Sequence, residues 1–388
     1  MTDPVFSFAS ELIANLDRLA ERVRNRVAPP GPRVLVLPGL PGTELGQRGP
    51  VTDDAIWFEF SNIRAGRLLD LAYGGPPLEP LGVFNMLYLQ IVLRLQGAGY
   101  DAAVHPFDWR RPIRELGEEL AAHVRAEERE VHLVTHGMGG LVARAAIALG
   151  APNLGKVVML APPNHGSFSV VQSMRGSHWV LHLLSAIDGR RTPDQLAAQV
   201  FSTWPSIYAQ IPARDRRSEI DLCDPDAWPQ EGPRPNRDLL LGASRIREWI
   251  EATTGQFYVI AGHGVPTVDH IERRDGVFHY ARSRCGDGWV PWSAAELDGY
   301  PCYHARAGHL SMPNHEDVIG AVEDLLARGA TTRLPLGPPP APERCSPLSD
   351  DAPPSPPFGG RRGPELGDDD IREALRHVLG LVAPLPIP

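Results

Sequence analysis

Residues Val131–Gly140 read VHLVTHGMGG. The β-branched run Val131–Val134 predicts a strand, and the segment Met138–Leu149 predicts a helix that begins with small residues. A direct change from strand to helix forces the residue between them, Gly137, into a sharp turn above the edge of the sheet. A phosphate-binding loop has a similar appearance, but no Lys follows and no G-x-G-x-x-G is present. We therefore interpret this turn as the place where a catalytic side chain would stand.

Strands and helices alternate on both sides of this stretch. This alternation predicts an α/β protein whose mostly parallel central sheet is flanked by helices, with right-handed crossovers. The predicted strands are Arg33–Leu37, Asp101–Phe107, Lys156–Ala161 and Phe257–Ala261, and the predicted helices are Phe84–Leu95, Ile113–Ala126 and His315–Leu326.

The chain divides into five predicted segments. Residues 1–30 read as an amphipathic helix, and residues 31–166 and 251–330 as the α/β core. Residues 167–250 are helical and loop-like without a strand, which is typical of a cap or lid inserted over a sheet. Residues 331–363 are rich in Pro, Gly and Ser and predict a disordered linker. Residues 364–388 predict a second amphipathic helix, with an apolar stripe within 368–382.

Composition excludes several classes of protein. The formal charge of −9 argues against nucleic-acid binding, which needs a basic surface. No run of 18 apolar residues is present, so we expect no transmembrane segment. The first 30 residues have no signal-peptide pattern, so we expect a cytoplasmic protein. The four cysteines lack metal-binding spacing, which predicts reduced thiols, and we expect neither a metal nor a cofactor.

Two later motifs supply an acid and a histidine. Asp287 lies in the turn GDGWVP, and His309 lies in GHL just before the last core helix. The order nucleophile, acid, histidine is the one that a Ser-His-Asp triad follows when the nucleophile stands on a strand-to-helix turn. The acid would hold the imidazole in one tautomer, and the imidazole would move the proton. The alternative is that Asp287 is a surface turn residue and His309 caps a helix.

The motifs together resemble the lecithin–cholesterol acyltransferase and phospholipase family of α/β hydrolases. They are LPGLPGTEL (37–45), FDWRRP (107–112), the 131–140 turn, GHGVPT (262–267), GDGWVP (286–291) and GHLSM (308–312). The resemblance implies an α/β-hydrolase fold and acyl-lipid chemistry. It also implies that the backbone N–H groups of Leu40 and Met138 form an oxyanion hole, with Asp287 and His309 as acid and base. Gly137 stands where the family has its nucleophilic serine.

A glycine at this position cannot carry an acyl group. Removing the nucleophile of a triad costs roughly 10⁶-fold in kcat, and Thr135 and His136 beside the turn are poor substitutes. Three explanations remain open: a pseudoenzyme that binds an acyl lipid or a partner, an active lipase or acyltransferase seen as a nucleophile-deleted variant, and base chemistry by the Asp287–His309 pair without an acyl-enzyme.

The expected ligand is an acyl lipid or another hydrophobic small molecule. Trp204, Tyr208 and Trp228 of the predicted cap either line its pocket or form the core of the cap. The apolar stripe of 368–382 either docks on a protein partner or packs on the parent domain.

Overall fold

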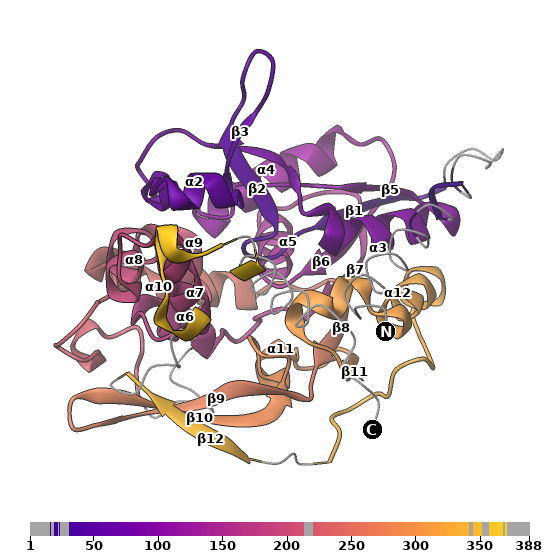
Figure 1. Cartoon of the computed structure of the whole chain (residues 1–388). Helices are drawn as coiled ribbons and strands as arrows, with labels where there is room; N and C mark the ends of the chain where they lie inside the picture. Colours follow the sequence, from indigo (N-terminus) through magenta and orange to yellow (C-terminus); the bar gives the residue numbers. More distant parts are fainter. Residues whose placement is uncertain are drawn as a thin grey trace, which may run out of the picture.

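The computed structural model describes residues 16, 19–21, 23, 31–212, 220–340, 344–350, 357–367 and 369–370. Its centre is a six-stranded sheet in the order β11-β8-β7-β6-β1-β5 (Figure 1). Every neighbouring pair of strands is parallel, which confirms the predicted α/β class. The strands are β1 (Arg33–Leu37), β5 (Asp101–Val104), β6 (Val131–His136), β7 (Leu154–Leu160), β8 (Gln256–Gly262) and β11 (Cys302–Ala305).

Side chains on successive residues of these strands point to opposite faces of the sheet. In β1, Val34 and Val36 pack into one buried cluster, whereas Leu35 and Leu37 pack into another. Strand β7 divides its apolar residues between the same two clusters. Burial on both faces explains why these strands are almost continuously apolar in sequence.

Helices cover both faces of the sheet. Helices α4 (Ile113–Ala126) and α5 (Gly139–Ala148) contribute to the cluster that contains Leu35 and Leu37. Helices α3 (Asn85–Gly97) and α12 (Glu316–Arg328) contribute to the opposite cluster. All four helices begin and end within two residues of the predicted positions, because their apolar periodicity matches the faces that they bury.

Two small antiparallel sheets were not predicted. One has the order β3-β2-β4 and the other the order β12-β10-β9 (Figure 1). Strand β12 lies inside the Pro-rich stretch 331–363 and pairs with β10, so the expectation of a disordered segment does not hold for these six residues. The strands are β2 (Thr43–Gln47), β3 (Asp54–Trp57), β4 (Glu79–Val83), β9 (Val265–Arg274), β10 (Val277–Gly286) and β12 (Arg344–Ser349).

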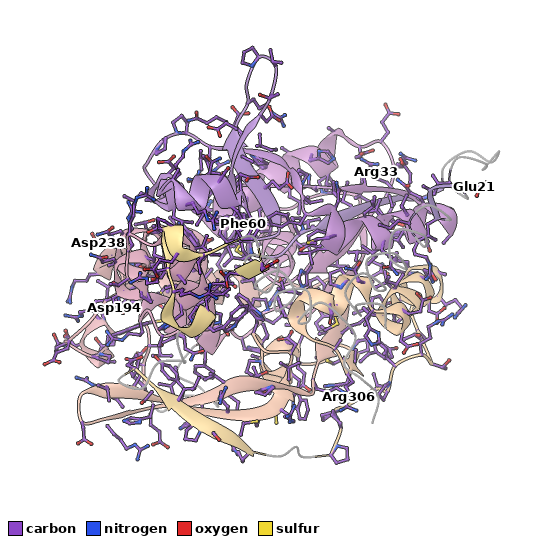
Figure 2. All side chains as sticks on the ribbon, in the orientation of Figure 1. Glu21, Arg33, Phe60, Asp194, Asp238 and Arg306 are labelled. Carbon is purple, nitrogen blue, oxygen red and sulfur yellow. The ribbon has the colours of Figure 1, made fainter. Side chains whose placement is uncertain are left out.

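The described part of segment 167–250 consists of helices and loops. These helices group beside one end of the central sheet (Figure 1), and the exposed Asp194 and Asp238 lie at their outer margin (Figure 2). They are α6 (Phe168–Met174), α7 (Trp179–Asp188), α8 (Pro193–Gln199), α9 (Pro205–Tyr208) and α10 (Arg237–Glu251). The short helices elsewhere are α2 (Phe60–Arg64) and α11 (Trp292–Ala295). Single 3₁₀ turns cover Arg67–Leu71, Phe201–Thr203, Pro225–Ala227, His309–Asn314, Pro357–Gly360 and Gly363–Glu365.

The two terminal helices predicted for 1–30 and 364–388 fall largely outside the described residues, and both stay predictions. Among the helices that the structure describes, each is too short or too polar to span a bilayer.

The contact between α4 and α5 gives a test of the packing. A Cβ atom added to the buried Gly117 of α4 would lie 2.6 Å from the Ala145 Cβ of α5. We expect Gly117→Ala to lower the free energy of unfolding by about 1–3 kcal/mol, because overpacking outweighs the better helix propensity of alanine. Urea unfolding monitored by circular dichroism measures this change.

Gly242→Ala is the matched control. Gly242 lies inside α10, and a Cβ atom there would meet nothing within 4 Å. This variant should be more stable by about 0.5–1 kcal/mol. Equal effects of the two substitutions would contradict the close packing of α4 on α5.

Candidate active site

The turn between β6 and α5 is built as the sequence predicts. Strand β6 ends at His136, α5 begins at Gly139, and Gly137 between them has φ +48°. The Gly137 N–H donates a 2.9 Å hydrogen bond to the Leu160 carbonyl at the end of β7. A Cβ atom on Gly139 would lie 2.7 Å from the Pro38 carbonyl oxygen, so a glycine is needed for α5 to start so close to the end of β1.

Asp287 and His309 form a buried pair. The His309 Nδ1 atom lies 2.8 Å from Asp287 Oδ2, and the two side chains are almost wholly buried. The other carboxylate oxygen of Asp287 accepts hydrogen bonds from the backbone N–H groups of Trp289 and Val290, at 2.9 and 2.7 Å. The His309 N–H also donates to the Asp287 carbonyl at 2.8 Å. Acid and histidine are therefore held by both their side chains and their backbones.

Gly137 and His309 face each other closely. An ideal Cβ atom built on Gly137 would lie 3.0 Å from His309 Nε2 and 3.3 Å from its Cε1. A side chain at position 137 would thus point directly at the imidazole. Because Nδ1 is bonded to the carboxylate, Nε2 carries the lone pair that faces Gly137. The structure brings Gly137, Asp287 and His309 together at one point.

The two backbone groups expected to bind an oxyanion also lie here. Leu40 and Met138 line one small cavity of about 50 Å³ together with Gly137 and His309. Within the described part of the chain, neither backbone N–H has a hydrogen-bond acceptor. Free donors beside a position for a reacting carbonyl are the arrangement that stabilises an oxyanion.

His136, which the sequence places beside the turn, lies against the site. Its ring centroid is 4.5 Å from that of His309. Its Nε2 atom is 3.0 Å from the His309 carbonyl oxygen, so this nitrogen donates. The Nδ1 atom then accepts from the Tyr88 hydroxyl at 2.9 Å, and that hydroxyl accepts from the Gly39 N–H at 2.9 Å. Both nitrogens of His136 are occupied, and neither is available for catalysis.

This network is uncharged. Burial lowers the pKa of His136 well below its usual value, with a smaller contribution from the neighbouring His309. Burial also raises the pKa of the Tyr88 hydroxyl. Both groups therefore stay neutral at neutral pH, and they hold the His309 backbone through directional hydrogen bonds instead of charge.

An apolar cavity of about 160 Å³ adjoins the site. It shares Leu40, Pro41 and Trp289 with the small cavity around Gly137. One wall is helix α7, and the others come from β3, α2 and the start of α3. A third cavity, of about 400 Å³, reaches His309 and Asp287 from the side of β9 and β10. The apolar wall residues are Trp57, Phe58, Phe60, Phe84, Leu87, Val180, Leu183, Leu184 and Ile187.

The three aromatic residues predicted for a pocket have different positions. Trp204 lines the small cavity, and its Nε1 donates to the Leu71 carbonyl at 2.7 Å. Tyr208 and Trp228 are buried and line none of the three cavities described here. Their polar atoms bond to the backbone of Ser202 and Leu222, so they belong to the core of segment 167–250.

Sequence reasoning missed Tyr88 and underrated Trp289. Tyr88 reads as one more apolar position of α3, and only the folded chain places its hydroxyl on His136. Trp289 follows Asp287 in GDGWVP and lines all three cavities, so its place in the motif was a usable signal.

Several solved structures are similar to this chain at low sequence identity. A chain of the Tle4-Tli4 complex matches with a TM-score of 0.51 and 14% identity, over 78% of this chain and 100% of its own. Bacillus licheniformis lipase BlEst2 in its mature form matches with a TM-score of 0.39 and 16% identity, over 74% of this chain and 89% of its own. EstA from Clostridium botulinum matches with a TM-score of 0.37 and 13% identity, over 79% and 89%. No protein-family model and no curated protein sequence matches the chain.

These identities bear on the fold alone. The six-stranded parallel sheet, the strand-to-helix turn at Gly137, the helices on both faces and the match to the Tle4-Tli4 chain confirm the predicted α/β-hydrolase fold.

The Tyr88 hydroxyl offers a test of the network behind His309. We expect Tyr88→Phe to lower the free energy of unfolding by about 1–3 kcal/mol, because the buried Gly39 N–H and His136 Nδ1 both lose their partner. Tyr73→Phe is the control, since Tyr73 is 39% exposed, and it should change stability by less than about 0.5 kcal/mol. Urea unfolding of the two variants side by side makes the measurement, and equal stabilities would contradict the network.

Proposed function

We propose that this chain is a lecithin–cholesterol acyltransferase- and phospholipase-like α/β hydrolase that binds an acyl lipid without forming an acyl-enzyme. The observation that carries the proposal is the position of Gly137. Two free backbone donors, Leu40 and Met138, and the Asp287–His309 pair surround a residue that has no side chain. Without a nucleophile, the remaining groups can hold a carboxyl or ester group but cannot become acylated.

The apolar cavity supports an acyl chain as the ligand. Its lining includes Leu40, one of the two donors, together with α7 and the aromatic side chains of β3 and α2. A carboxyl or ester oxygen at the Leu40 and Met138 N–H groups would leave the attached chain beside this cavity. Burying a chain methylene contributes about 0.8 kcal/mol, so chain length should control affinity.

A second candidate function is base chemistry by His309. The observation that favours it is the free Nε2 atom, which has no hydrogen-bond partner among the described residues and faces the small cavity. An imidazole oriented by a carboxylate can take a proton from water or from a substrate carbon. The donors at Leu40 and Met138 would then stabilise the resulting negative charge.

Two further expectations from the sequence stay predictions. Docking of a protein partner on 368–382 concerns residues that lie almost wholly outside the described part of the chain. The cytoplasmic location likewise remains a prediction.

Restoring the nucleophile separates these functions. We expect Gly137→Ser to hydrolyse short-chain p-nitrophenyl esters at least about 10³-fold faster than the unmodified chain, because only the hydroxyl is missing. Stability should fall by about 1–3 kcal/mol, since serine is strained at φ +48°. Its Cβ atom at 3.0 Å from Nε2 also requires His309 to move by a few tenths of an ångström.

Gly137→Ala is the matched control for this experiment. It adds the same Cβ atom and the same backbone strain, but no hydroxyl, so it should lose stability without gaining activity. Adding His309→Ala to the serine variant should abolish the gain. A folded but inert serine variant would mean that the pocket no longer fits an ester. Turnover by the unmodified chain that His309→Ala removes would favour base chemistry.

Lipid binding can be tested in the unmodified chain. We expect saturated fatty acids to bind with an affinity that rises about tenfold for every two added methylenes within the cavity, measured by isothermal titration calorimetry. Leu184→Trp should weaken binding at least about tenfold, because Leu184 of α7 lines the apolar cavity. Leu241→Trp is the control, on an exposed position of α10. Equal affinity in both variants would exclude this cavity as the acyl site.

A further inference from the structure

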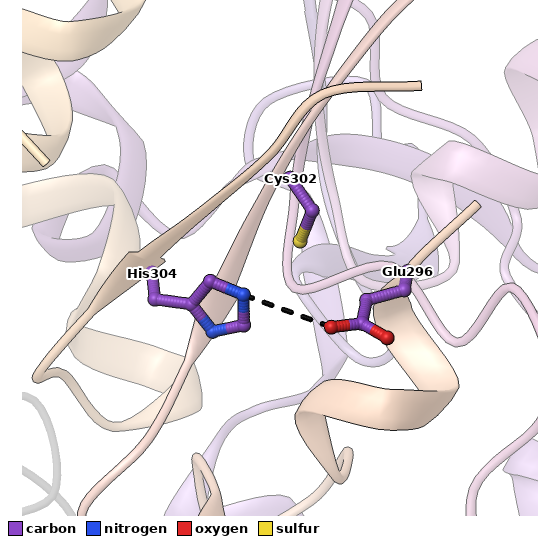
Figure 3. A group of neighbouring side chains, drawn as sticks. All are labelled: Glu296, Cys302 and His304. Carbon is purple, nitrogen blue, oxygen red and sulfur yellow. Dashed lines mark ion pairs between the residues drawn. The ribbon is translucent and has the colours of Figure 1, made fainter. Parts of the chain in front are cut away.

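A second group of reactive side chains lies at the edge strand of the central sheet. Cys302 and His304 are two residues apart on β11, so their side chains share one face of the strand. Glu296 directly follows α11 as its C-cap residue, six positions before Cys302. Figure 3 shows the three side chains converging, with Glu296 reaching toward the imidazole from the helix and Cys302 beside it. Each of the three residues offers one potential metal-ligand atom. These three atoms all lie within 4.8 Å of one another.

The distance between the His304 and Glu296 ligand atoms suits a shared ion better than a direct hydrogen bond. His304 Nε2 and Glu296 Oε1 are 3.7 Å apart, which is too long for a hydrogen bond. Zinc binds histidine nitrogen at about 2.0–2.1 Å and carboxylate oxygen at about 2.0–2.2 Å, almost always with tetrahedral angles. Two such ligand atoms lie about 3.3–3.5 Å apart across the ion. The observed separation is therefore within a few tenths of an ångström of the required one.

The imidazole of His304 lacks hydrogen bonds among the residues that the structure describes. The side chain is fully buried, and neither Nδ1 nor Nε2 has a hydrogen-bond partner there, although Glu296 Oε1 lies 3.7 Å from Nε2. Burial lowers the pKa of His304 to about 4, so the ring is neutral at neutral pH and offers a lone pair. Buried polar atoms are almost always paired, and an imidazole with both nitrogens unpaired beside a carboxylate and a thiol fits a bound ion.

The set of donors identifies the class of ion. A thiol, an imidazole and a carboxylate are the ligands of Zn²⁺, whereas Ca²⁺ and Mg²⁺ prefer oxygen alone. A cysteine binds a metal ion as the thiolate, so binding of the ion displaces the proton of the thiol. A bound divalent ion, one thiolate and one carboxylate sum to zero charge, which suits a half-buried site.

We propose that Glu296, Cys302 and His304 form a binding site for Zn²⁺, with a water molecule as the fourth ligand. None of the three residues lines the cavities around Gly137, so the ion would act on structure and not on a substrate. The site lies in the segment between Asp287 and His309 and would tie the end of α11 to β11. It would thereby stiffen the chain that carries both members of the acid–histidine pair. The cysteine spacing alone had excluded a metal, because the third ligand is a glutamate that no cysteine motif contains.

The test uses the full untagged chain, reduced and freed of metal. We expect one equivalent of Co²⁺ to produce the visible bands of a tetrahedral site and a near-ultraviolet thiolate-to-cobalt band, and Zn²⁺ to displace it. Cys302→Ser should remove the thiolate band, and His304→Gln should weaken binding at least about tenfold. Cys345→Ser is the control on β12 and should leave the spectrum unchanged. A missing thiolate band in the unmodified chain, or a band that survives in Cys302→Ser, would overturn the proposal.

A second measurement does not depend on the folding of any variant. Zn²⁺ should slow alkylation of Cys302 by iodoacetamide in the unmodified chain at least about tenfold, as followed by peptide mass spectrometry, because a metal-bound thiolate is shielded. Alkylation of Cys345 in the same sample should not change. Equal rates at Cys302 with and without Zn²⁺ would contradict the site.

Discussion

The close approach of α5 to the end of β1 is the constraint on which the site depends. Gly139 permits this approach, because any side chain there would meet the carbonyl of Pro38. It places Gly137 beside the loop that carries Leu40, so that two backbone donors from different segments face one point. The bond from Gly137 N–H to Leu160 ties β7 into the same arrangement. The backbone therefore makes the geometry of these donors, and no side chain of residue 137 takes part in it.

The retained acid and histidine do not by themselves demand catalysis. Asp287 holds the turn after β10 by accepting two backbone hydrogen bonds, and it fixes the backbone of His309 through its own carbonyl. His136 donates to the His309 carbonyl from the other side. Removing either member of the pair would leave buried polar groups unpaired, at about 1–3 kcal/mol each. Stability alone can therefore account for the presence of the pair beside a glycine, and glycine at φ +48° avoids the strain that a serine would carry.

Elements with a regular apolar periodicity could be predicted from the sequence. Elements that form only by pairing with a strand far away in the sequence were missed. Strand β1 and helix α4 lie at the predicted residues because their own patterns define the buried faces. Strand β12 is exposed or half-buried along its length and exists through pairing with β10. The β9–β10 hairpin had a signal in its Asp275-Gly276 turn. Asp287 and His309 were found by their motifs, whereas Tyr88 could not be, because its role lies in a hydroxyl on an ordinary helix face.

The buried histidines of this protein differ in the hydrogen-bond partners of their ring nitrogens more than in their depth of burial. His136 uses both nitrogens on Tyr88 and a carbonyl, and His309 uses one on Asp287 and turns the other toward a cavity. His304 is as deeply buried, yet it bonds to nothing in the described chain. Desolvation keeps the rings of both His136 and His304 neutral, so charge does not separate their roles. A ring with two partners is structural, a ring with one free nitrogen in a cavity can act on a ligand, and a ring such as His304, with neither nitrogen hydrogen-bonded, is the one that fits the proposed ion.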